Sequence, residues 1–195
     1  MPWDSASFDL LRSEVDASLR GARPPGGVPF FLYVYDPTEE VQCLRRFDRV
    51  ARMFQGLEFH VQVVYMGLLI ARVLQRTLYL SEVGKQAEAR NPSALLRELS
   101  RPNGLPSRVA LALLEGVEGV CEPLQDGSQN RCAILLRAGA AYPFLHISQI
   151  LDALENRTDW TVVVPFPGSR HSEKPETLRF LNERDGPYYR ARIIG

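Results

Sequence analysis

Histidine and serine side chains stand close together near the end of this sequence, where they could form a hydrolytic site. His171 lies in a polar loop between Ser169 and Ser172, and a serine becomes a nucleophile when a histidine accepts its proton. No G-x-S-x-G motif surrounds either serine, and no acidic residue can be assigned as partner of the histidine. We therefore assign no catalytic residue. A small α/β hydrolase or nuclease, using His171 or His146 with nearby carboxylates, stays an alternative.

The other histidine and the cysteines favour structural roles. His60 falls within a predicted strand, and Cys132 opens an apolar segment, which is typical of a buried thiol. The three cysteines, Cys43, Cys121 and Cys132, include no CxxC pair, so we expect no metal and no cofactor. Reduced thiols and an N-terminus without a secretory signal predict a cytoplasmic protein.

The first predicted strand and the turn after it argue against nucleotide binding. Phe30–Tyr35 is continuously apolar, which predicts a strand buried on both faces in a parallel sheet. In the following DPTEE segment, Asp36 suits a helix N-cap and Pro37 the first helical position. A P-loop needs glycines and a lysine at this turn, and neither is present. The carboxylates would repel phosphate, so we interpret the turn as a structural cap.

Apolar spacing predicts the remaining elements along the chain. We expect helices over residues 7–19, 37–55, 66–80, 93–99, 107–116 and 144–154, with residues 81–90 either continuing the third helix or breaking at Gly84. We expect further strands over residues 59–64, 132–137, 160–166 and 188–194.

The alternation of strands and helices predicts the fold class. It indicates an α/β, three-layer protein with a mainly parallel sheet flanked by helices. The 195 residues fit a single α/β domain, residues 1–195, with a helical insert at about residues 66–120. Formal net charge is zero, which disfavours a dedicated nucleic-acid binder. The longest apolar stretch, residues 61–74, is too short to span a bilayer, so we expect no membrane association.

The stretch from Thr161 to Ile194 combines several kinds of residue. It predicts a buried strand, a Pro-Phe-Pro-Gly turn, a polar loop, a short helical segment around Leu178 and Phe180, and a last strand. Basic residues alternate with aromatic ones toward its end, which suits nucleic acid or a protein partner. The same alternation is typical of a half-exposed edge strand, and we favour that interpretation, with a protein interface as the main functional one.

Three segments together resemble the BrxB family of bacteriophage exclusion (BREX) defence systems. They are VPFFLYVYDPTEE at residues 28–40, GAAYPFLHISQILDAL at 139–154 and VVVPFPGSRHSEKPETLRFLNERDGPYYRARII at 162–194. Their order and spacing extend over most of the chain. The sequence SRHSEKPE after the Pro-Gly turn departs from the acidic-polar run that is common in the family.

The resemblance implies a non-catalytic component of a phage-defence complex. Such a component would act as a protein–protein interaction module that bridges larger subunits, a PglZ-like phosphatase-fold protein and a PglX-like DNA methyltransferase. It also implies a core similar to that of P-loop nucleoside triphosphatases without a Walker A motif, and DNA association would be indirect. A DNA-contacting accessory protein is a further alternative. The expected interaction surface comprises Tyr142, Phe144, His171, Phe180, Tyr188, Tyr189, Arg190 and Arg192.

Overall fold

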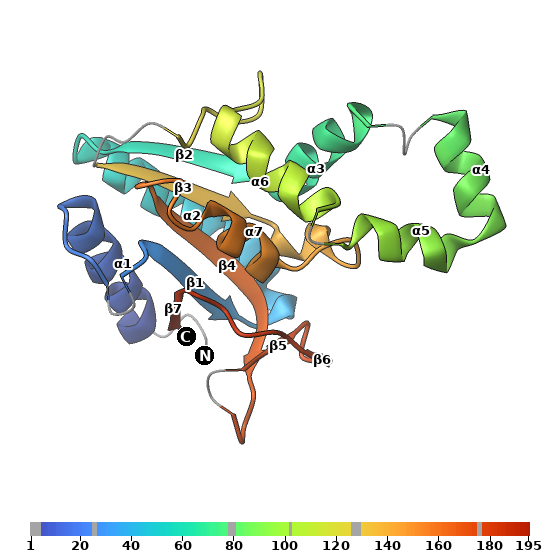
Figure 1. The fold of residues 1–195 in the computed structure, drawn as a ribbon. Helices are drawn as coiled ribbons and strands as arrows, with labels where there is room; N and C mark the ends of the chain where they lie inside the picture. Colours follow the sequence, from blue (N-terminus) through green and yellow to red (C-terminus); the bar gives the residue numbers. More distant parts are fainter. Residues whose placement is uncertain (1–4, 25–26, 78–80, 102, 126–129, 175–176) are drawn as a thin grey trace.

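A largely parallel sheet forms the centre of the protein. The computed structural model describes residues 5–24, 27–77, 81–101, 103–125, 130–174 and 177–195. Within them, five parallel strands lie in the order β2-β3-β4-β1-β7 (Figure 1). Their bounds are His60–Tyr65 for β2, Arg131–Leu136 for β3, Thr161–Arg170 for β4, Phe30–Tyr35 for β1 and Arg192–Ile194 for β7. The α/β fold with a mainly parallel sheet is thus confirmed.

Strand β1 shows why the sheet is covered on both faces. All six of its residues are buried, and alternate side chains point to opposite faces of a strand. Phe31, Tyr33 and Tyr35 enter one apolar core, whereas Phe30 and Leu32 enter the other. The uninterrupted apolar sequence of β1 therefore follows from its central position between two helical layers.

Helices from different parts of the chain cover the two faces. Residues of α1 (Ser5–Leu19) and α2 (Glu40–Gly56) share one apolar core with the sheet. Residues of α3 (Met66–Gln75), α6 (Leu105–Glu115) and α7 (Ile147–Leu154) share the other. The three-layer arrangement predicted from the sequence is confirmed. No described helix is long and apolar enough to cross a membrane.

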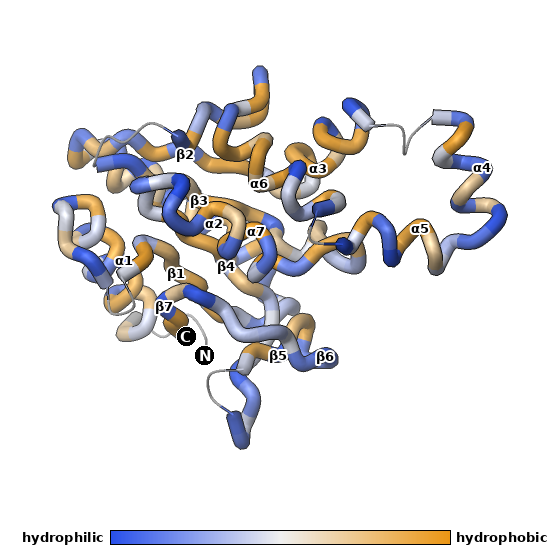
Figure 2. Tube along the Cα trace, in the orientation of Figure 1, coloured by the Kyte–Doolittle hydropathy of each residue, from blue (hydrophilic) through white to orange (hydrophobic). Residues whose placement is uncertain are grey.

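Two short helices extend away from the sheet between α3 and α6. They are α4 (Glu82–Arg90) and α5 (Pro92–Leu99), and Asn91 caps α5 by accepting a hydrogen bond from the Ala94 backbone N–H at 3.0 Å. Gly84 is the buried residue of α4 and Leu99 that of α5. Figure 1 shows both helices at the right of the molecule, and Figure 2 shows hydrophilic stretches along α4. Residues 82–90 form a helix that runs through Gly84, so the break considered at Gly84 is wrong. Residues 78–80, the end of the helix predicted over 66–80, lie outside the described residues.

The segment around Leu178 is a strand, so the prediction of a short helix there is wrong. Leu178–Phe180 forms β5, which pairs antiparallel with the end of β4, and Arg184–Asp185 forms β6 beside β5. At Gly168 in β4 a Cβ atom would lie 2.0 Å from the carbonyl oxygen of Arg179, so only glycine permits this pairing. Three residues are too few for spacing to distinguish a helix from a strand, and the pairing with β4 decides the outcome.

The last predicted strand is shorter than the sequence indicates. Only Arg192–Ile194 forms β7, which pairs with β1, while residues 188–191 lie outside any strand. Within the described residues β7 has one neighbouring strand, so its position at an edge of the sheet is confirmed. The expected alternation of Tyr188, Arg190 and Arg192 on one strand face is wrong, because the chain is irregular before Arg192.

Candidate functional site

Asp36 caps the short turn after β1, and the α-helix begins three residues later than the sequence predicts. The Asp36 carboxylate accepts hydrogen bonds from the Thr38 backbone N–H at 2.9 Å and from the Thr38 hydroxyl at 2.6 Å. These bonds favour the ionised carboxyl and lower the pKa of Asp36. A short 3-10 turn, Pro37–Glu39, then precedes α2. The carboxylate thus occupies one of the N–H groups that a phosphate would need and places negative charge at this turn.

The cysteines are protonated and mostly buried. Burial raises the pKa of Cys132 to about 12, and it raises the pKa values of Cys43 and Cys121 as well. Cys43 lies beside the Tyr35 hydroxyl, which donates a hydrogen bond to the Glu40 carboxylate. Because the thiolate is the nucleophilic form, these environments oppose cysteine catalysis.

The three histidines lie apart in the structure. His60 Nε2 is 2.7 Å from a carboxylate oxygen of Glu122, and its ring meets Trp160 edge-on at 5.6 Å. His146 precedes α7, where its backbone N–H donates to the Gln149 side chain. In the described ranges, no group of three or more histidine, cysteine, aspartate or glutamate side chains could hold a metal ion.

His171 is held by its own loop. Its Nδ1 accepts a hydrogen bond from the Glu173 backbone N–H at 3.1 Å, and its Nε2 is 3.8 Å from Asp185. The carboxylate of Asp185 also lies 3.4 Å from Arg179. In this described loop neither neighbouring serine hydrogen-bonds to the histidine, so the geometry does not assemble the serine–histidine pair that the sequence left open.

Four aromatic rings form a continuous row across the C-terminal hairpin. Tyr142 packs on Phe180 with ring centres 5.4 Å apart, Phe180 meets Phe166 at 5.7 Å, and Phe166 meets Tyr189 at 5.4 Å. The guanidinium of Arg184 lies over the Tyr142 ring, 5.3 Å from its centre. Aromatic contacts of this kind stabilise the pair beyond the area they bury. We call this set, Tyr142, Phe166, Phe180, Arg184 and Tyr189, the aromatic row.

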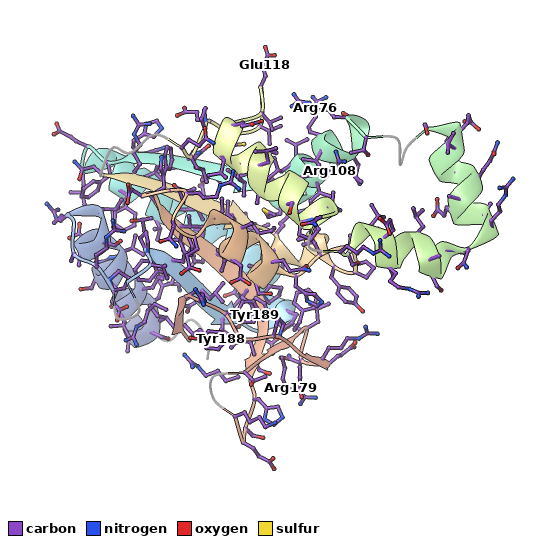
Figure 3. The ribbon with its side chains drawn as sticks, in the orientation of Figure 1. Arg76, Arg108, Glu118, Arg179, Tyr188 and Tyr189 are labelled. Carbon is purple, nitrogen blue, oxygen red and sulfur yellow. The ribbon has the colours of Figure 1, made fainter. Side chains whose placement is uncertain are left out.

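The aromatic row has a buried end and an accessible end. Tyr189 is only 3% exposed and Phe166 is buried, so both belong to the core under β4. Tyr142 and Phe180 are half-buried, and Arg184 is exposed. Tyr188 is 72% exposed and points away from the core; Figure 3 shows it beside Tyr189, above Arg179. Tyr189 was expected on the surface, and that expectation is wrong.

Most of the predicted basic residues have partners within the chain. The guanidinium of Arg190 contacts both carboxylate oxygens of Glu155 at 2.6 and 2.8 Å. Arg192 binds the carboxylate of Glu14 through two nitrogens, Nε and Nη2. Arg170 donates to the carbonyl oxygens of Ile193 and Gly195. These contacts tie the end of the chain to the body and reduce the positive charge available to DNA.

The structure thus brings together some residues of the predicted interaction surface and separates others. Tyr142, Phe180 and Tyr189 come together, and Phe144 is half-buried against the same core. His171, Arg190 and Arg192 bind other residues of the chain, and Tyr188 is exposed at the surface.

Arg184 completes the site and was absent from the predicted surface. It stands opposite Phe180 in the β5–β6 pair. A hairpin recognised in the segment LRFLNERD would have revealed this pairing, because residues opposite one another in adjacent strands are neighbours.

Comparison with known proteins supports the resemblance seen in the sequence. The model of one protein family, described as BREX protein BrxB, matches residues 64–194. No curated protein and no solved structure matches the chain. The matched residues include α3 to α7, β3 to β7 and the whole aromatic row, whereas α1, β1 and α2 precede them. The chain belongs to the BrxB family of BREX phage-defence proteins.

Proposed function

We propose that this protein is a non-catalytic interaction module that bridges larger subunits of a BREX defence complex. The observation that carries the proposal is the accessible end of the aromatic row. There the Arg184 guanidinium stacks on the Tyr142 ring, and the ring packs on Phe180. Tyrosine and arginine are enriched among residues that dominate binding at protein interfaces.

Rigid support makes these side chains suitable for binding. The row continues into the core through Phe166 and Tyr189, and Gly168 allows β5 to lie tightly against β4. Side chains that are already ordered lose little conformational entropy when a partner binds. The exposed ring of Tyr188 adds an apolar surface on the same C-terminal segment.

The partners that we propose are a PglZ-like phosphatase-fold protein and a PglX-like DNA methyltransferase. Other BREX components are expected companions, because the family belongs to BREX systems. The raised pKa values of the buried cysteines agree with a role that does not use a thiolate. Any DNA association would then pass through the partners.

Co-elution tests this proposal. The tagged chain is co-expressed with the products of neighbouring genes and examined by size-exclusion chromatography. We expect a complex with at least one larger subunit that is lost on Arg184→Glu and on Tyr142→Ala. Tyr65→Ala is the matched control, because Tyr65 is also an exposed tyrosine but lies at the end of β2. Failure of the wild-type chain to co-elute with any neighbour would overturn the proposal.

A further inference from the structure

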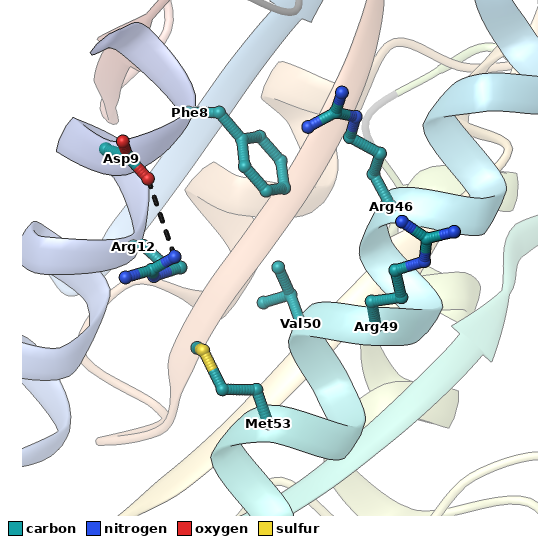
Figure 4. Close-up of a pocket in the computed structure, with 7 residues that line it drawn as sticks. All are labelled: Phe8, Asp9, Arg12, Arg46, Arg49, Val50 and Met53. Carbon is teal, nitrogen blue, oxygen red and sulfur yellow. Dashed lines mark ion pairs between the residues drawn. The ribbon is translucent and has the colours of Figure 1, made fainter. Parts of the chain in front are cut away.

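A groove with an apolar floor and a basic rim lies between α1 and α2. Its open volume is about 280 Å³, which is close to the lower end of the range for ligand pockets. Figure 4 shows the side chains that line it. Phe8, Val50 and Met53 form the floor, and Arg12, Arg46 and Arg49 form the rim. We call these six residues the α1–α2 groove.

The floor of the groove offers room for an apolar side chain. Val50 and Met53 lie one helical turn apart on α2, and Phe8 faces them from α1. Phe8 is 8% exposed, and its ring already carries the Arg46 guanidinium at 5.7 Å. The ring is therefore largely buried, whereas nucleic-acid bases stack on exposed aromatic rings.

The rim of the groove is rich in arginine. Within the described residues, Arg49 forms no ion pair, and Arg12 has a long contact of 3.5 Å with Asp9. Three arginines and one aspartate line the groove, although the formal net charge of the whole chain is zero.

The acidic residues of α2 do little to offset that charge. Glu40 accepts the hydrogen bond of Tyr35 at the start of the helix, and Asp48 is paired with Arg52 at 2.8 Å. Asp9 is the acidic residue that lines the groove. The groove therefore favours a ligand that brings its own carboxylates.

We propose that the α1–α2 groove binds an acidic peptide segment of a partner protein. One apolar side chain of the segment occupies the floor formed by Phe8, Val50 and Met53, and flanking carboxylates contact Arg12, Arg46 and Arg49. Guanidinium groups recognise carboxylates with two parallel hydrogen bonds, which supplies both attraction and orientation.

This groove is separate from the aromatic row. It lies in the layer formed by α1 and α2, whereas the row belongs to the core shared by α3, α6 and α7. It also precedes residues 64–194, the part of the chain that the family model matches. Two binding surfaces on opposite faces of the sheet would allow one chain to hold two partners. The proposal for the groove does not depend on the proposal for the aromatic row.

Fluorescence anisotropy of the full chain with a labelled peptide tests the groove. The probe is a heptapeptide of six glutamates with a central phenylalanine. We expect saturable binding below about 1 mM, with about tenfold weaker binding for Arg49→Glu. Arg45→Glu is the matched control, because Arg45 is an exposed arginine on the same helix but does not line the groove. It should change the affinity by less than about twofold.

Further probes separate the proposal from simpler explanations. Replacing the central phenylalanine of the peptide by alanine should weaken binding, and replacing the glutamates by lysines should abolish it. Two results would contradict a groove that binds an apolar side chain flanked by carboxylates. One is an equal loss of affinity with Arg45→Glu and Arg49→Glu, and the other is equal affinity for the alanine and phenylalanine peptides. Equally strong competition by a single-stranded oligonucleotide would also contradict it. A dimer of the chain that Arg49→Glu dissociates would identify a second copy as the occupant and overturn the proposal.

Discussion

Arg192 in the last strand binds Glu14 in the first helix through its Nε and Nη2 atoms. The three contacts between guanidinium and carboxylate measure 2.9, 3.0 and 3.2 Å. The hydrogen bonds to Glu14 stabilise the charged guanidinium and raise the pKa of Arg192 above its ordinary value. An arginine that the sequence suggested for partner binding therefore holds the two ends of the chain together.

Arg192→Ala should reduce stability and leave partner binding intact. Both side chains are partly exposed, at 39% for Arg192 and 22% for Glu14, so solvent screens the pair. We expect a loss of about 1 kcal/mol in the free energy of unfolding, measured by urea denaturation. A double-mutant cycle with Glu14→Gln should yield a coupling of similar size. Unchanged stability combined with a lost complex would instead place Arg192 in an interface.

Gly168→Ala should separate β5 from β4. The new Cβ atom would lie 2.0 Å from the Arg179 carbonyl oxygen, a distance that neither backbone can accommodate. We expect a loss of about 2–4 kcal/mol and faster hydrogen exchange in β5. Gly139→Ala is the control, because its nearest neighbour would be at an ordinary 3.6 Å. Equal stability of the two variants would show that the close approach does not hold the hairpin.

Asp36→Ala should destabilise the start of α2, and Asp36→Asn should largely preserve it, because asparagine is also a good cap. The pKa of Asp36 is lowered by hydrogen bonds from Thr38, so the folded state prefers the ionised form. Its contribution is present above the ordinary pKa of about 4 and is lost as the pH falls below it. Thermal melts of wild type and Asp36→Ala should therefore converge in acid. A constant difference from pH 7 to pH 2 would contradict the cap.

The thiols should react slowly in the native protein. Burial raises the pKa values of Cys43, Cys121 and Cys132, so few thiolates exist at pH 8. We expect a disulfide reagent such as DTNB to label the native chain far more slowly than the urea-unfolded chain. Rapid labelling of one cysteine in the native state would reveal an activated thiol and reopen the enzymatic alternative.

The same thiols should make the protein less stable in alkali. Between the unfolded pKa near 9 and the folded value of about 12, Cys132 is protonated only in the folded state. Stability is therefore fully present below pH 9 and falls as the pH rises above it. Cys132→Ala should flatten this fall in urea titrations, and an unchanged slope would contradict the buried neutral thiol.

Apolar runs and helix-capping residues predicted the strands and helices that depend on neighbouring residues in the sequence. The apolar run Phe30–Tyr35 coincides with β1, and Asn91-Pro92 marks the start of α5. The strand at Leu178 was missed because its pairing with β4 involves residues brought together by the fold. Likewise, nothing near Arg192 in the sequence points to Glu14, since 178 positions separate them.

The sequence predicted two aromatic residues of the candidate site, but it did not reveal which arginines are held in ion pairs within the chain. Tyr142 and Phe180 were expected at the surface and do meet there. Arg190 was expected beside them, but its guanidinium is bound to Glu155 on the chain just after α7. Burial of Tyr189 could not be inferred either, because its partner Phe166 belongs to β4, far from it in the sequence.

Direct titration of the purified chain against the PglZ-like and PglX-like proteins tests the bridging role most directly. Isothermal titration calorimetry should give saturable binding to at least one of them. The double variant Tyr188→Ala/Arg184→Glu should weaken it by about tenfold or more, while Tyr65→Ala should leave it within about twofold. Absence of binding to both proteins, or equal weakening by the control, would contradict the account.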